Sequence, residues 1–329
     1  MSNFVVTVLA IVGFVLIMLL ITVFLYKRIE KWNTNDDTGN NGDVTELREE
    51  HFGNDEMADL VRSFNSMEGA LKRQMENVAV MTAERERVHA ELSIATKIQA
   101  DMLPANFPER DDFSLFATMS PAKEVGGDFY DFFMIDEDHL GLVMADVSGK
   151  GVPAALFMAI AKTLIKNRAA LGGSPARVLE DVNDMLCENN ASGLFVTVWF
   201  SILEISTGTL TVCNAGHEYP VFRRSGGDYE LVESDNLPPL AAMEEMEYED
   251  VSITLNAGDE LFLYTDGVPE AKSSSGKRFG TDKMLEVLNG SKDTSIKDQL
   301  KNLKSEIDSF TGGGDPFDDI TMLMLRVTK

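Results

Sequence analysis

The chain has 329 residues, of which 54 are acidic and 29 are basic, so its formal net charge is −25. This balance argues against a nucleic-acid partner, because binding to phosphate backbones requires clustered Lys and Arg side chains. It fits a well-solvated surface or sites for hard cations. The two cysteines, Cys187 and Cys213, lie in a helical and a strand pattern without paired spacing. We therefore expect reduced core thiols and neither a disulfide framework nor a zinc site.

An apolar segment of 23 residues, Phe4 to Tyr26, contains no charged side chain. As a helix rising ~1.5 Å per residue it reaches ~34 Å, enough for a bilayer core of ~30 Å. A cleaved signal peptide is the alternative, but it requires a positive region before a shorter apolar run. Here Lys27, Arg28 and Lys31 follow the run, and no basic residue precedes it. The positive-inside rule predicts a single-pass anchor, residues 1–27, in the inner (cytoplasmic) membrane, with the rest of the chain in the cytoplasm.

Residues 28–54 are polar and irregular, and we interpret them as a linker. From residue 55 the pattern changes, because apolar residues recur at alternating steps of three and four from Met57 to Met102. This 3.5-residue period is typical of a coiled coil, and Pro104 ends it. We expect residues 55–104 to form a long helix that pairs with a second copy of the chain in a homodimer.

Three polar residues, Gln74, Arg85 and Gln99, fall in the predicted seam of the coiled coil. Such residues weaken the pairing but fix its register and favour a dimer. The alternative is one long amphipathic helix that folds back on the following domain, and its C-terminal part could do both. The start of the helix, residues 55–67, resembles the second helix of a HAMP signalling module. The first HAMP helix is not recognisable in the linker.

Residues 105–329 are expected to form one domain in which strands and helices do not alternate strictly. An alternating strand begins at Phe113, and an acidic turn joins two strands within residues 126–146. The later elements expected are helices at 151–170 and 175–190, strands at 194–205, 209–215, 219–223, 251–255 and 260–265, helices at 279–288 and 295–310, and a strand at 320–327. This order predicts an α+β fold with largely antiparallel sheets.

Aspartates stand at the ends of several apolar strands. Asp128 follows a Gly pair at the start of one strand, and Asp146 ends the next. Asp266 follows the strand at 260–265, and Asp318 and Asp319 precede the last strand. A single Asp in a turn is common. Four such acids on strands that could share one sheet edge predict a cluster, whose carboxylates would repel one another in the absence of cations.

The donor atoms of this cluster are all oxygens, which favours magnesium or manganese over zinc, and no Cys–His cluster indicates otherwise. A calcium-binding module is a further alternative. However, the sequence has no contiguous D-x-D-x-D-G loop with a downstream Glu.

Five motifs occur in the order G-G-D-F-Y-D, A-D-V-S-G-K-G, N-A-G-H, Y-T-D-G and D-D-I-T. Together they resemble the metal-dependent (PPM-type) protein serine/threonine phosphatases, and more closely the bacterial SpoIIE/RsbU branch, over residues 92–327. The lead-in Q-A-D-M-L-P at residues 99–104 is typical of that branch. The resemblance implies an αββα sandwich of two sheets flanked by helices, with a two-metal centre at one end of the sheets.

The resemblance also implies a role for each acid. Asp146 matches the residue that bridges both metals, and the backbone carbonyl of Val147 would reach the second metal. Asp128 would serve that second metal directly or through water. Asp266 and Asp318 match the acids that hold the first metal.

Asp318 is preferred to Asp319 because it fills the leading position of the family's D-[DN]-x-T pattern, although sequence physics alone does not separate the two. In such a centre, two divalent ions ~3.5–4 Å apart lower the pKa of a bridging water and clamp phosphate oxygens. That water attacks phosphorus in line, so no phosphoenzyme is required. The two cysteines then have no catalytic role.

Three further features each have two interpretations. His217, in the N-A-G-H motif, is either a general acid or a structural residue in a turn. Lys150 either contacts substrate phosphate or only belongs to a tight turn before a helix. Residues 270–283 are either a flap beside the site or a plain loop. The sequence shows no clear equivalent of the Arg that binds phosphate in eukaryotic PPM enzymes.

The sequence therefore predicts a membrane-anchored phosphoprotein phosphatase that uses two manganese or magnesium ions in signal transduction. By resemblance, its substrate is a phosphorylated Ser or Thr on a STAS-domain regulator, an anti-sigma factor antagonist, which implies a role in sigma factor regulation. The alternative is a non-enzymatic, membrane-tethered signalling scaffold with a degenerate phosphatase fold. Such a scaffold would lack a metal acid, and none is missing.

Overall fold

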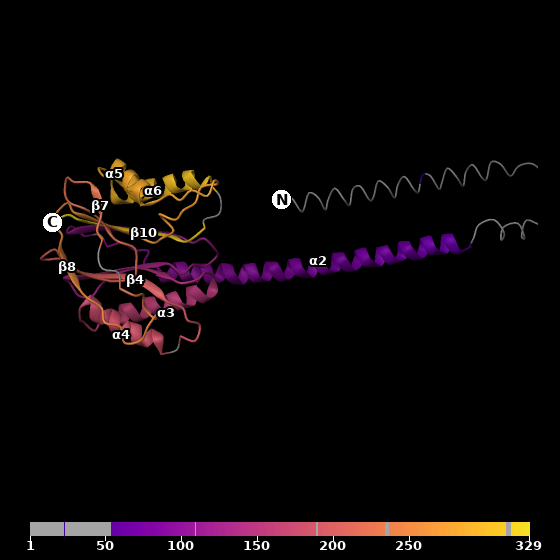
Figure 1. Ribbon diagram of the computed structural model, residues 1–329, viewed down its shortest axis with the longest axis horizontal. Coiled ribbons are helices and arrows are strands. Elements are labelled where there is room, and N and C mark those ends of the chain that lie inside the picture. Colours follow the sequence, from indigo (N-terminus) through magenta and orange to yellow (C-terminus); the bar gives the residue numbers. More distant parts are fainter. Residues whose placement is uncertain (1–22, 24–53, 109, 189, 234–236, 314–316) are drawn as a thin grey trace, which may run out of the picture. The chain divides into compact units, whose positions relative to one another are not determined.

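Two antiparallel sheets packed on each other form the centre of the domain that follows the long helix (Figure 1). The computed structural model describes residues 23, 54–108, 110–188, 190–233, 237–313 and 317–329. Contacts divide the chain into two units, Met1–Thr82 and Ala83–Lys329. In the described part of the chain, no helix is both long and apolar enough to cross a bilayer. Apart from residue 23, the predicted anchor lies outside the described residues, as does nearly all of the predicted linker, so both stay predictions.

Helix α2 (Asn54–Met102) runs for 49 residues, as the period of the sequence predicts. Its apolar side chains at Leu71, Val78 and Val88 are 46%, 58% and 49% exposed. Toward the C-terminal end of α2 the same stripe turns inward, and Gln99 is buried. The exposed stripe is the seam predicted for a coiled coil, but the structure is of one chain, so the pairing itself stays a prediction.

The sheets have the strand orders β2-β3-β4-β5-β8 and β1-β10-β9-β6-β7, and all pairings are antiparallel. The strands are β1 (Phe113–Ser120), β2 (Phe129–Met134), β3 (His139–Val147), β4 (Val196–Glu204), β5 (Thr209–Ala215), β6 (Val221–Arg223), β7 (Tyr229–Leu231), β8 (Val251–Thr254), β9 (Glu260–Tyr264) and β10 (Ile320–Val327). The helices after α2 are α3 (Val152–Ala169), α4 (Pro175–Cys187), α5 (Thr281–Ser291) and α6 (Ile296–Thr311).

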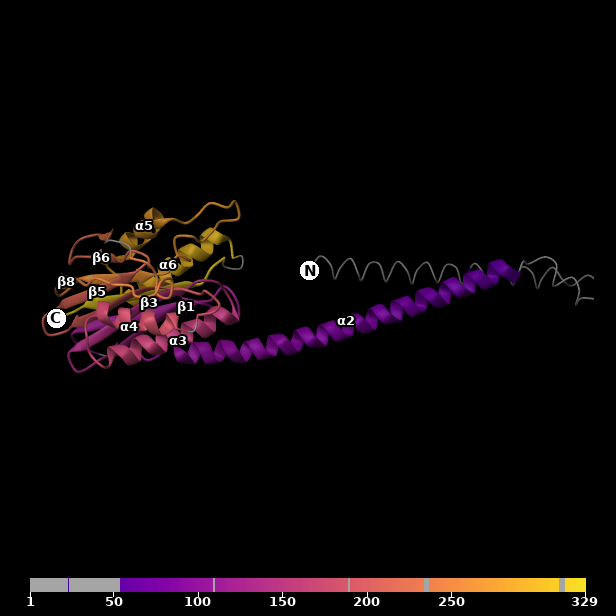
Figure 2. The same ribbon diagram turned by 60° about the horizontal axis from the view of Figure 1, so that its bottom comes forward.

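Helices α3 and α4 cover the outer face of one sheet, and α5 and α6 cover the outer face of the other (Figures 1 and 2). The predicted α+β fold with two antiparallel sheets between layers of helices is therefore confirmed for this unit. The three-residue strand β7 is the element that the sequence analysis missed. Cys213 is buried in β5, as predicted for a core thiol, whereas Cys187 at the end of α4 is only partly buried.

Strand β3 shows how the sequence dictates the layers. Leu140, Leu142 and Met144 pack into the core between the two sheets, whereas Val143 and Ala145 face the core under α3 and α4. Because both faces of β3 are covered, its apolar run has no polar alternation. The strand is therefore fixed on both sides, which positions its end.

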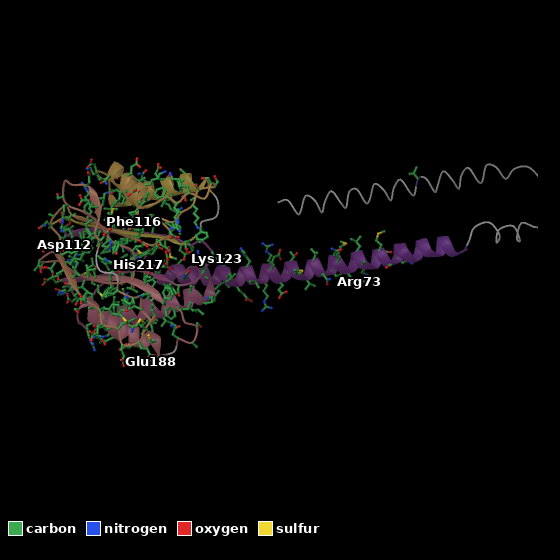
Figure 3. All side chains as sticks on the ribbon, viewed as in Figure 1. Arg73, Asp112, Phe116, Lys123, Glu188 and His217 are labelled. Atoms are coloured by element: carbon green, nitrogen blue, oxygen red, sulfur yellow. The ribbon has the colours of Figure 1, made fainter. Side chains whose placement is uncertain are left out.

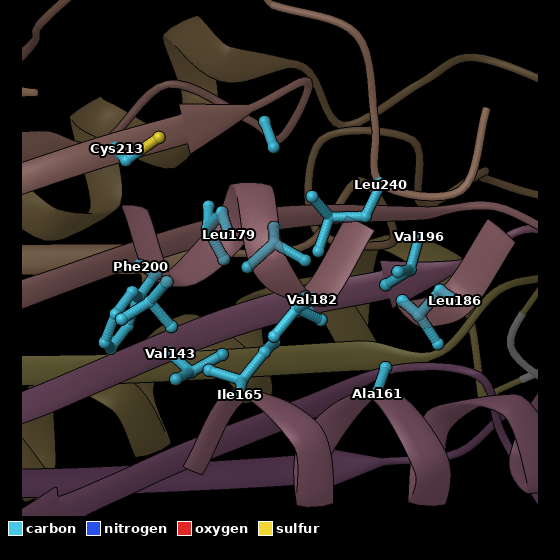
Figure 4. Packing of buried hydrophobic residues seen from close by; sticks show 14 of the residues in the cluster. Val143, Ala161, Ile165, Leu179, Val182, Leu186, Val196, Phe200, Cys213 and Leu240 are labelled. Atoms are coloured by element: carbon cyan, nitrogen blue, oxygen red, sulfur yellow. The ribbon is translucent and has the colours of Figure 1, made fainter. Parts of the chain in front are cut away.

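The core beneath α3 and α4 is shown in Figure 4. There Ile165 of α3 and Leu179 and Val182 of α4 meet side chains on the outer face of the sheet, and each of the three is at most 1% exposed. Close packing of this kind transmits small displacements and tolerates few changes of volume. It holds the sheet rigidly behind the edge where the aspartates lie.

Candidate metal centre

The predicted acids lie at strand ends that antiparallel pairing brings together. In one sheet β2 begins beside the end of β3, so Asp128 and Asp146 are neighbours. In the other sheet β10 begins just beyond the end of β9, so Asp266 and Asp318 are neighbours as well. Asp128 and Asp146 are far from Asp266 and Asp318 in the sequence, but the topology places each pair at neighbouring strand ends of one sheet.

Hydrogen bonds to Asp128 connect the strand ends of the two sheets. Its Oδ2 atom accepts hydrogen bonds from the hydroxyl groups of Thr265 at 2.6 Å and Thr321 at 2.8 Å. Thr265 directly precedes Asp266, and Thr321 lies in β10. The Thr321 N–H donates to the Thr265 hydroxyl oxygen at 3.2 Å. The Asp128 carboxylate at the start of β2 is therefore held by two threonines at the ends of β9 and β10 in the other sheet. All four acids thus belong to one site.

Burial and mutual repulsion raise the pKa values of these carboxyl groups. Burial, together with the negative charge of Asp266, raises the pKa of Asp146 to about 7. Burial and Asp318 raise the pKa of Asp266 to about 6, although Lys150 acts in the opposite direction. Burial and then Asp146 raise the pKa of Asp128 well above its usual range. Burial and the neighbouring acids therefore make ionisation of these groups unfavourable where no cation is bound.

Asp318 and Asp319 have different partners. Asp318 accepts a hydrogen bond from the Lys150 ammonium group through Oδ2 at 2.7 Å, and its side chain is 27% exposed. Asp319 is buried; its Oδ1 accepts the Ala122 N–H at 2.7 Å and its Oδ2 accepts the Gly127 N–H at 2.9 Å. Asp319 is therefore committed to backbone groups, whereas Asp318 faces the site.

Glycines allow this close packing around Asp319. A Cβ atom on Gly126 would lie 2.1 Å from Asp319 Oδ2, and one on Gly267 would lie 1.8 Å from the Asp319 carbonyl oxygen. A Cβ atom on Gly127 would lie 2.8 Å from the Val147 carbonyl oxygen. The carbonyl predicted to serve the second metal thus lies against the Gly-Gly turn. A larger residue would displace the Asp319 side chain at Gly126 and the backbone at Gly127 and Gly267.

The C-terminal end of α2 also holds this turn. The Gln99 amide nitrogen donates to the Gly126 carbonyl at 2.7 Å, and the Gln99 amide oxygen accepts the Gly126 N–H at 3.0 Å. Thr96 donates to the Glu124 carbonyl at 2.6 Å. The prediction that Gln99 lies in an intermolecular seam is therefore wrong, because both polar groups of its side chain are bonded within its own chain.

His217 is a buried link between the sheets and not a free acid; Figure 3 labels it in the interior of the domain. Its Nε2 lies 3.1 Å from the Tyr264 carbonyl, which can only accept, so Nε2 donates. Burial lowers the pKa of His217 to about 4, so the ring is neutral and its Nδ1 accepts from the Thr197 hydroxyl at 2.9 Å. Of the two interpretations, the contacts favour the structural one.

The turn after β3 presents Lys150. Gly149 and Gly151 have φ values of 94° and 79°, a left-handed region in which other residues are strained. This conformation reverses the chain directly after Asp146 and places the Lys150 ammonium group beside Asp318. It also starts α3 at once, with Pro153 in its first turn.

The cluster fits hard divalent cations, since its donors are carboxylate oxygens with raised pKa values. Within the described ranges, no three His, Cys, Asp or Glu side chains are arranged to hold a metal ion as they stand. Asp128 accepts hydrogen bonds from Thr265 and Thr321, and Asp318 accepts one from Lys150.

Comparison with known proteins decides the family. The model of the family described as Stage II sporulation protein E (SpoIIE) matches residues 136–328. The chain belongs to the SpoIIE family. Protein IcfG of Synechocystis sp. is 30% identical over 298 residues, which cover 82% of this chain and 46% of IcfG. Phosphoserine phosphatase RsbU of Bacillus subtilis is 30% identical over 249 residues, 74% of this chain and 71% of RsbU. Because the match covers 46% of IcfG, this chain spans less than half the length of that relative.

Among solved structures, the SiaA-PP2C domain of Pseudomonas aeruginosa has the same fold, with a TM-score of 0.65 and 21% identity. The match covers 75% of this chain and 98% of that domain. This SpoIIE-family domain thus has the PP2C fold. The relatives RsbU and RsbP of Bacillus subtilis are both described as phosphoserine phosphatases.

The structure brings the four predicted acids close enough to influence one another's pKa values, but nothing in it assigns the metal-ligand roles. Sequence reasoning missed the hydroxyl groups that hold Asp128 and the backbone role of Asp319. It also missed Glu218, next to His217, whose pKa is raised by burial and by Asp266. The N-A-G-H motif indicated this neighbourhood, but only tertiary contacts show which groups meet there.

Proposed function

We propose that this chain is a metal-dependent phosphoprotein phosphatase that hydrolyses phosphoserine or phosphothreonine. The observation that carries the proposal is the cluster of acids at the ends of β2, β3, β9 and β10, with pKa values of about 7 for Asp146 and about 6 for Asp266. Buried carboxylates that repel one another destabilise a protein, so their gathering calls for a cationic partner. Membership of the SpoIIE family supports the same activity.

In the proposed enzyme, Asp128, Asp146, Asp266 and Asp318, with the Val147 carbonyl, hold two manganese or magnesium ions. A structure of similar fold, RsbX in complex with magnesium, supports a hard cation; its TM-score is 0.53 at 16% identity, over 68% of this chain and 99% of that one. When bound, such ions supply Lewis acidity at the phosphate oxygens and activate water at neutral pH.

The chain's own residues hold the acids in place before substrate arrives. Thr265 and Thr321 fix Asp128, and Asp319 fixes the backbone of the turn that carries it. Neutral His217 ties the strand before Asp266 to the neighbouring sheet. Groups held in this way need little reordering during the reaction, which is how a rigid scaffold contributes to catalysis.

For the substrate, we propose a phosphorylated STAS-domain regulator of the anti-sigma antagonist class. The support is the similarity to RsbU and RsbP of Bacillus subtilis, both described as phosphoserine phosphatases. The strongly acidic chain makes a nucleic-acid target unsuitable. A folded substrate has to present its phosphorylated residue on a surface loop to reach the cluster.

For the assembly, we propose a homodimer paired along α2 and anchored by residues 1–27 in the cytoplasmic membrane. The exposed apolar side chains of α2, such as Leu71 and Val78, support the pairing. The charge-free N-terminal segment and the basic residues after it support the anchor. A signal would reach the metal centre through the Gln99 contact with the Gly-Gly turn.

A membrane-tethered scaffold without activity is the second candidate. It predicts a damaged site, whereas every acid of the pattern is present. The test is hydrolysis of p-nitrophenyl phosphate by the purified chain with manganese, with and without chelator. We expect turnover that chelator abolishes and that Asp146→Asn lowers at least about a hundredfold. Equal rates for wild type and variant would refute the enzyme.

A further inference from the structure

An exposed aromatic ring lies at the rim of the carboxylate cluster between two lysines. Phe317 directly precedes Asp318, and its side chain is 58% exposed. The Lys150 Nζ lies 4.5 Å from the ring centroid, and the Lys272 Nζ lies 3.7 Å from it. Two cations and one large apolar surface therefore meet beside the acids.

The three residues come from three different segments of the site. Lys150 lies in the turn after β3, four residues beyond Asp146, and Lys272 lies in the loop that follows Asp266. In that loop an isolated bridge pairs Lys272 with Arg278, which gives the lysine a defined backbone position. The turns that present the predicted metal acids therefore present the two ammonium groups as well.

Attraction to the ring alone explains this arrangement poorly. An exposed cation–π contact contributes about 0.5–1 kcal/mol, and two ammonium groups around one ring repel each other. Lys150 is balanced by Asp318 and by the Phe317 carbonyl, each at 2.7 Å. In the part of the chain that the structure describes, Lys272 has no carboxylate within ion-pair distance. An anion beside the ring would relieve this repulsion.

We propose that Phe317, Lys150 and Lys272 form the docking point for a phosphorylated serine or threonine segment of the substrate. The ammonium groups of the two lysines bind the phosphate as point charges. The Phe317 ring packs against an apolar group of the substrate next to the phosphorylated residue. This inference rests on the proposed phosphatase function. It names the group that binds phosphate where the sequence shows no equivalent arginine.

The arrangement also gives the Lys150 ammonium group two alternative partners, Asp318 and the substrate phosphate. Its present bond to Asp318 is one of the contacts that has to break if Asp318 turns toward a cation. The freed ammonium group then remains within reach of the Phe317 ring, at the position where phosphate would enter. Occupation of the metal site and readiness for substrate are linked in this way through one side chain.

The test compares three variants of the full chain, Lys272→Gln, Phe317→Ala and Lys277→Gln. Lys277 is an exposed lysine of the same loop that does not contact the ring, so it is the matched control. The substrates are a phosphoserine peptide and p-nitrophenyl phosphate, and inorganic phosphate is titrated by calorimetry into the manganese-loaded protein. The last measurement does not require turnover.

For Lys272→Gln we expect KM for both substrates and Kd for phosphate to rise about fivefold, with kcat within about twofold, because one partly exposed charge contact contributes about 1 kcal/mol. Phe317→Ala should raise KM for the peptide alone. Lys277→Gln should change none of these values. The effect of Lys272→Gln should shrink at high salt.

Unchanged KM and phosphate Kd in Lys272→Gln would overturn the docking point, while wild-type turnover would leave the phosphatase proposal standing. If instead the wild type hydrolyses neither substrate, the phosphatase proposal fails. The phosphate titration still decides the docking point in that case, since equal binding by wild type and Lys272→Gln contradicts it.

Discussion

The carboxylate of Asp319 accepts the backbone N–H of Gly127 at 2.9 Å, across 192 residues of sequence. Its neighbour Asp318 accepts the Lys150 ammonium group through Oδ2 and the adjacent Asp319 N–H through Oδ1. Two adjacent aspartates that the sequence does not distinguish therefore have separate tasks. Asp319 holds the turn that carries Asp128, and Asp318 pairs with Lys150.

This difference predicts opposite behaviour of two conservative variants. Asp318→Asn should leave stability nearly unchanged but abolish metal-dependent turnover. Asp319→Asn should lose about 1–3 kcal/mol of stability, because an amide NH₂ would face a backbone donor in a buried site. Thermal unfolding and manganese titration of both variants check this. Equal stability losses, or full activity in Asp318→Asn, would contradict the assignment.

The raised pKa of Asp146 predicts an unusual pH dependence of the metal-free protein. Between pH 4 and 7 the unfolded carboxyl group is ionised while the folded one still holds its proton, so stability is lost as pH rises. Asp146→Asn removes that ionisation. We expect the metal-free variant to be more stable than wild type by about 1–3 kcal/mol at pH 8, with the gain shrinking toward pH 5.

Urea unfolding at both pH values measures this difference, with Asp101→Asn, an exposed acid at the end of α2, as the control. Manganese should reverse the order at pH 8, because it stabilises only a protein that binds it. A variant that is less stable than metal-free wild type at pH 8 would show that Asp146 is not under electrostatic strain.

The glycine after Asp266 predicts a steric effect. In Gly267→Ala the new Cβ would lie 1.8 Å from a backbone oxygen of Asp319, which no side-chain rotation relieves. We expect a loss of about 1–3 kcal/mol and of most activity, because both acidic segments have to move. Gly290→Ala is the control: it lies exposed in α5 with no atom within 4 Å of its added Cβ, and should gain about 0.5–1 kcal/mol.

The exposed stripe of α2 predicts a change of assembly without a change of fold. Leu71 is 46% exposed in the single chain, so Leu71→Lys should leave unfolding of the catalytic unit unaltered. In the proposed dimer it places like charges in the seam, and we expect monomers and an altered basal rate. Arg73→Gln, outside the seam, is the control. Sedimentation that finds the same mass for wild type and Leu71→Lys would refute the pairing.

The fold could be predicted well because its elements have strong local signals. The apolar run of β3 and the period of α2 each specify one structure. Strand β7 was missed because Tyr229–Leu231 is too short to show a period of two. Gln99 was misplaced for a different reason: a helical stripe shows which residues face a partner but not whether that partner is another chain or the same one.

The site, like the fold, contains residues that could be predicted from the sequence and residues that could not. Asp128, Asp146 and Asp266 could be found because each stands where an apolar strand begins or ends, and strand ends of one sheet meet. Their supporting hydroxyl groups carried no such signal, since a Thr in or after a strand is ordinary. The lysines at Phe317 were beyond prediction as a group, because three turns from distant parts of the chain have to close before they meet.

The pair of hydrogen bonds between the Gln99 side chain and the Gly126 backbone affects how this protein can be divided into fragments or fused to other domains. A fragment starting at Phe113 would retain every strand of both sheets but leave the Gly126 peptide groups without their amide partner. Rates measured on such a fragment would describe a loosened turn rather than the intact protein. Fusions that exchange the upstream helix for another dimerising segment should accordingly be joined before Thr96, so that the final turns of α2 travel with the domain they complete.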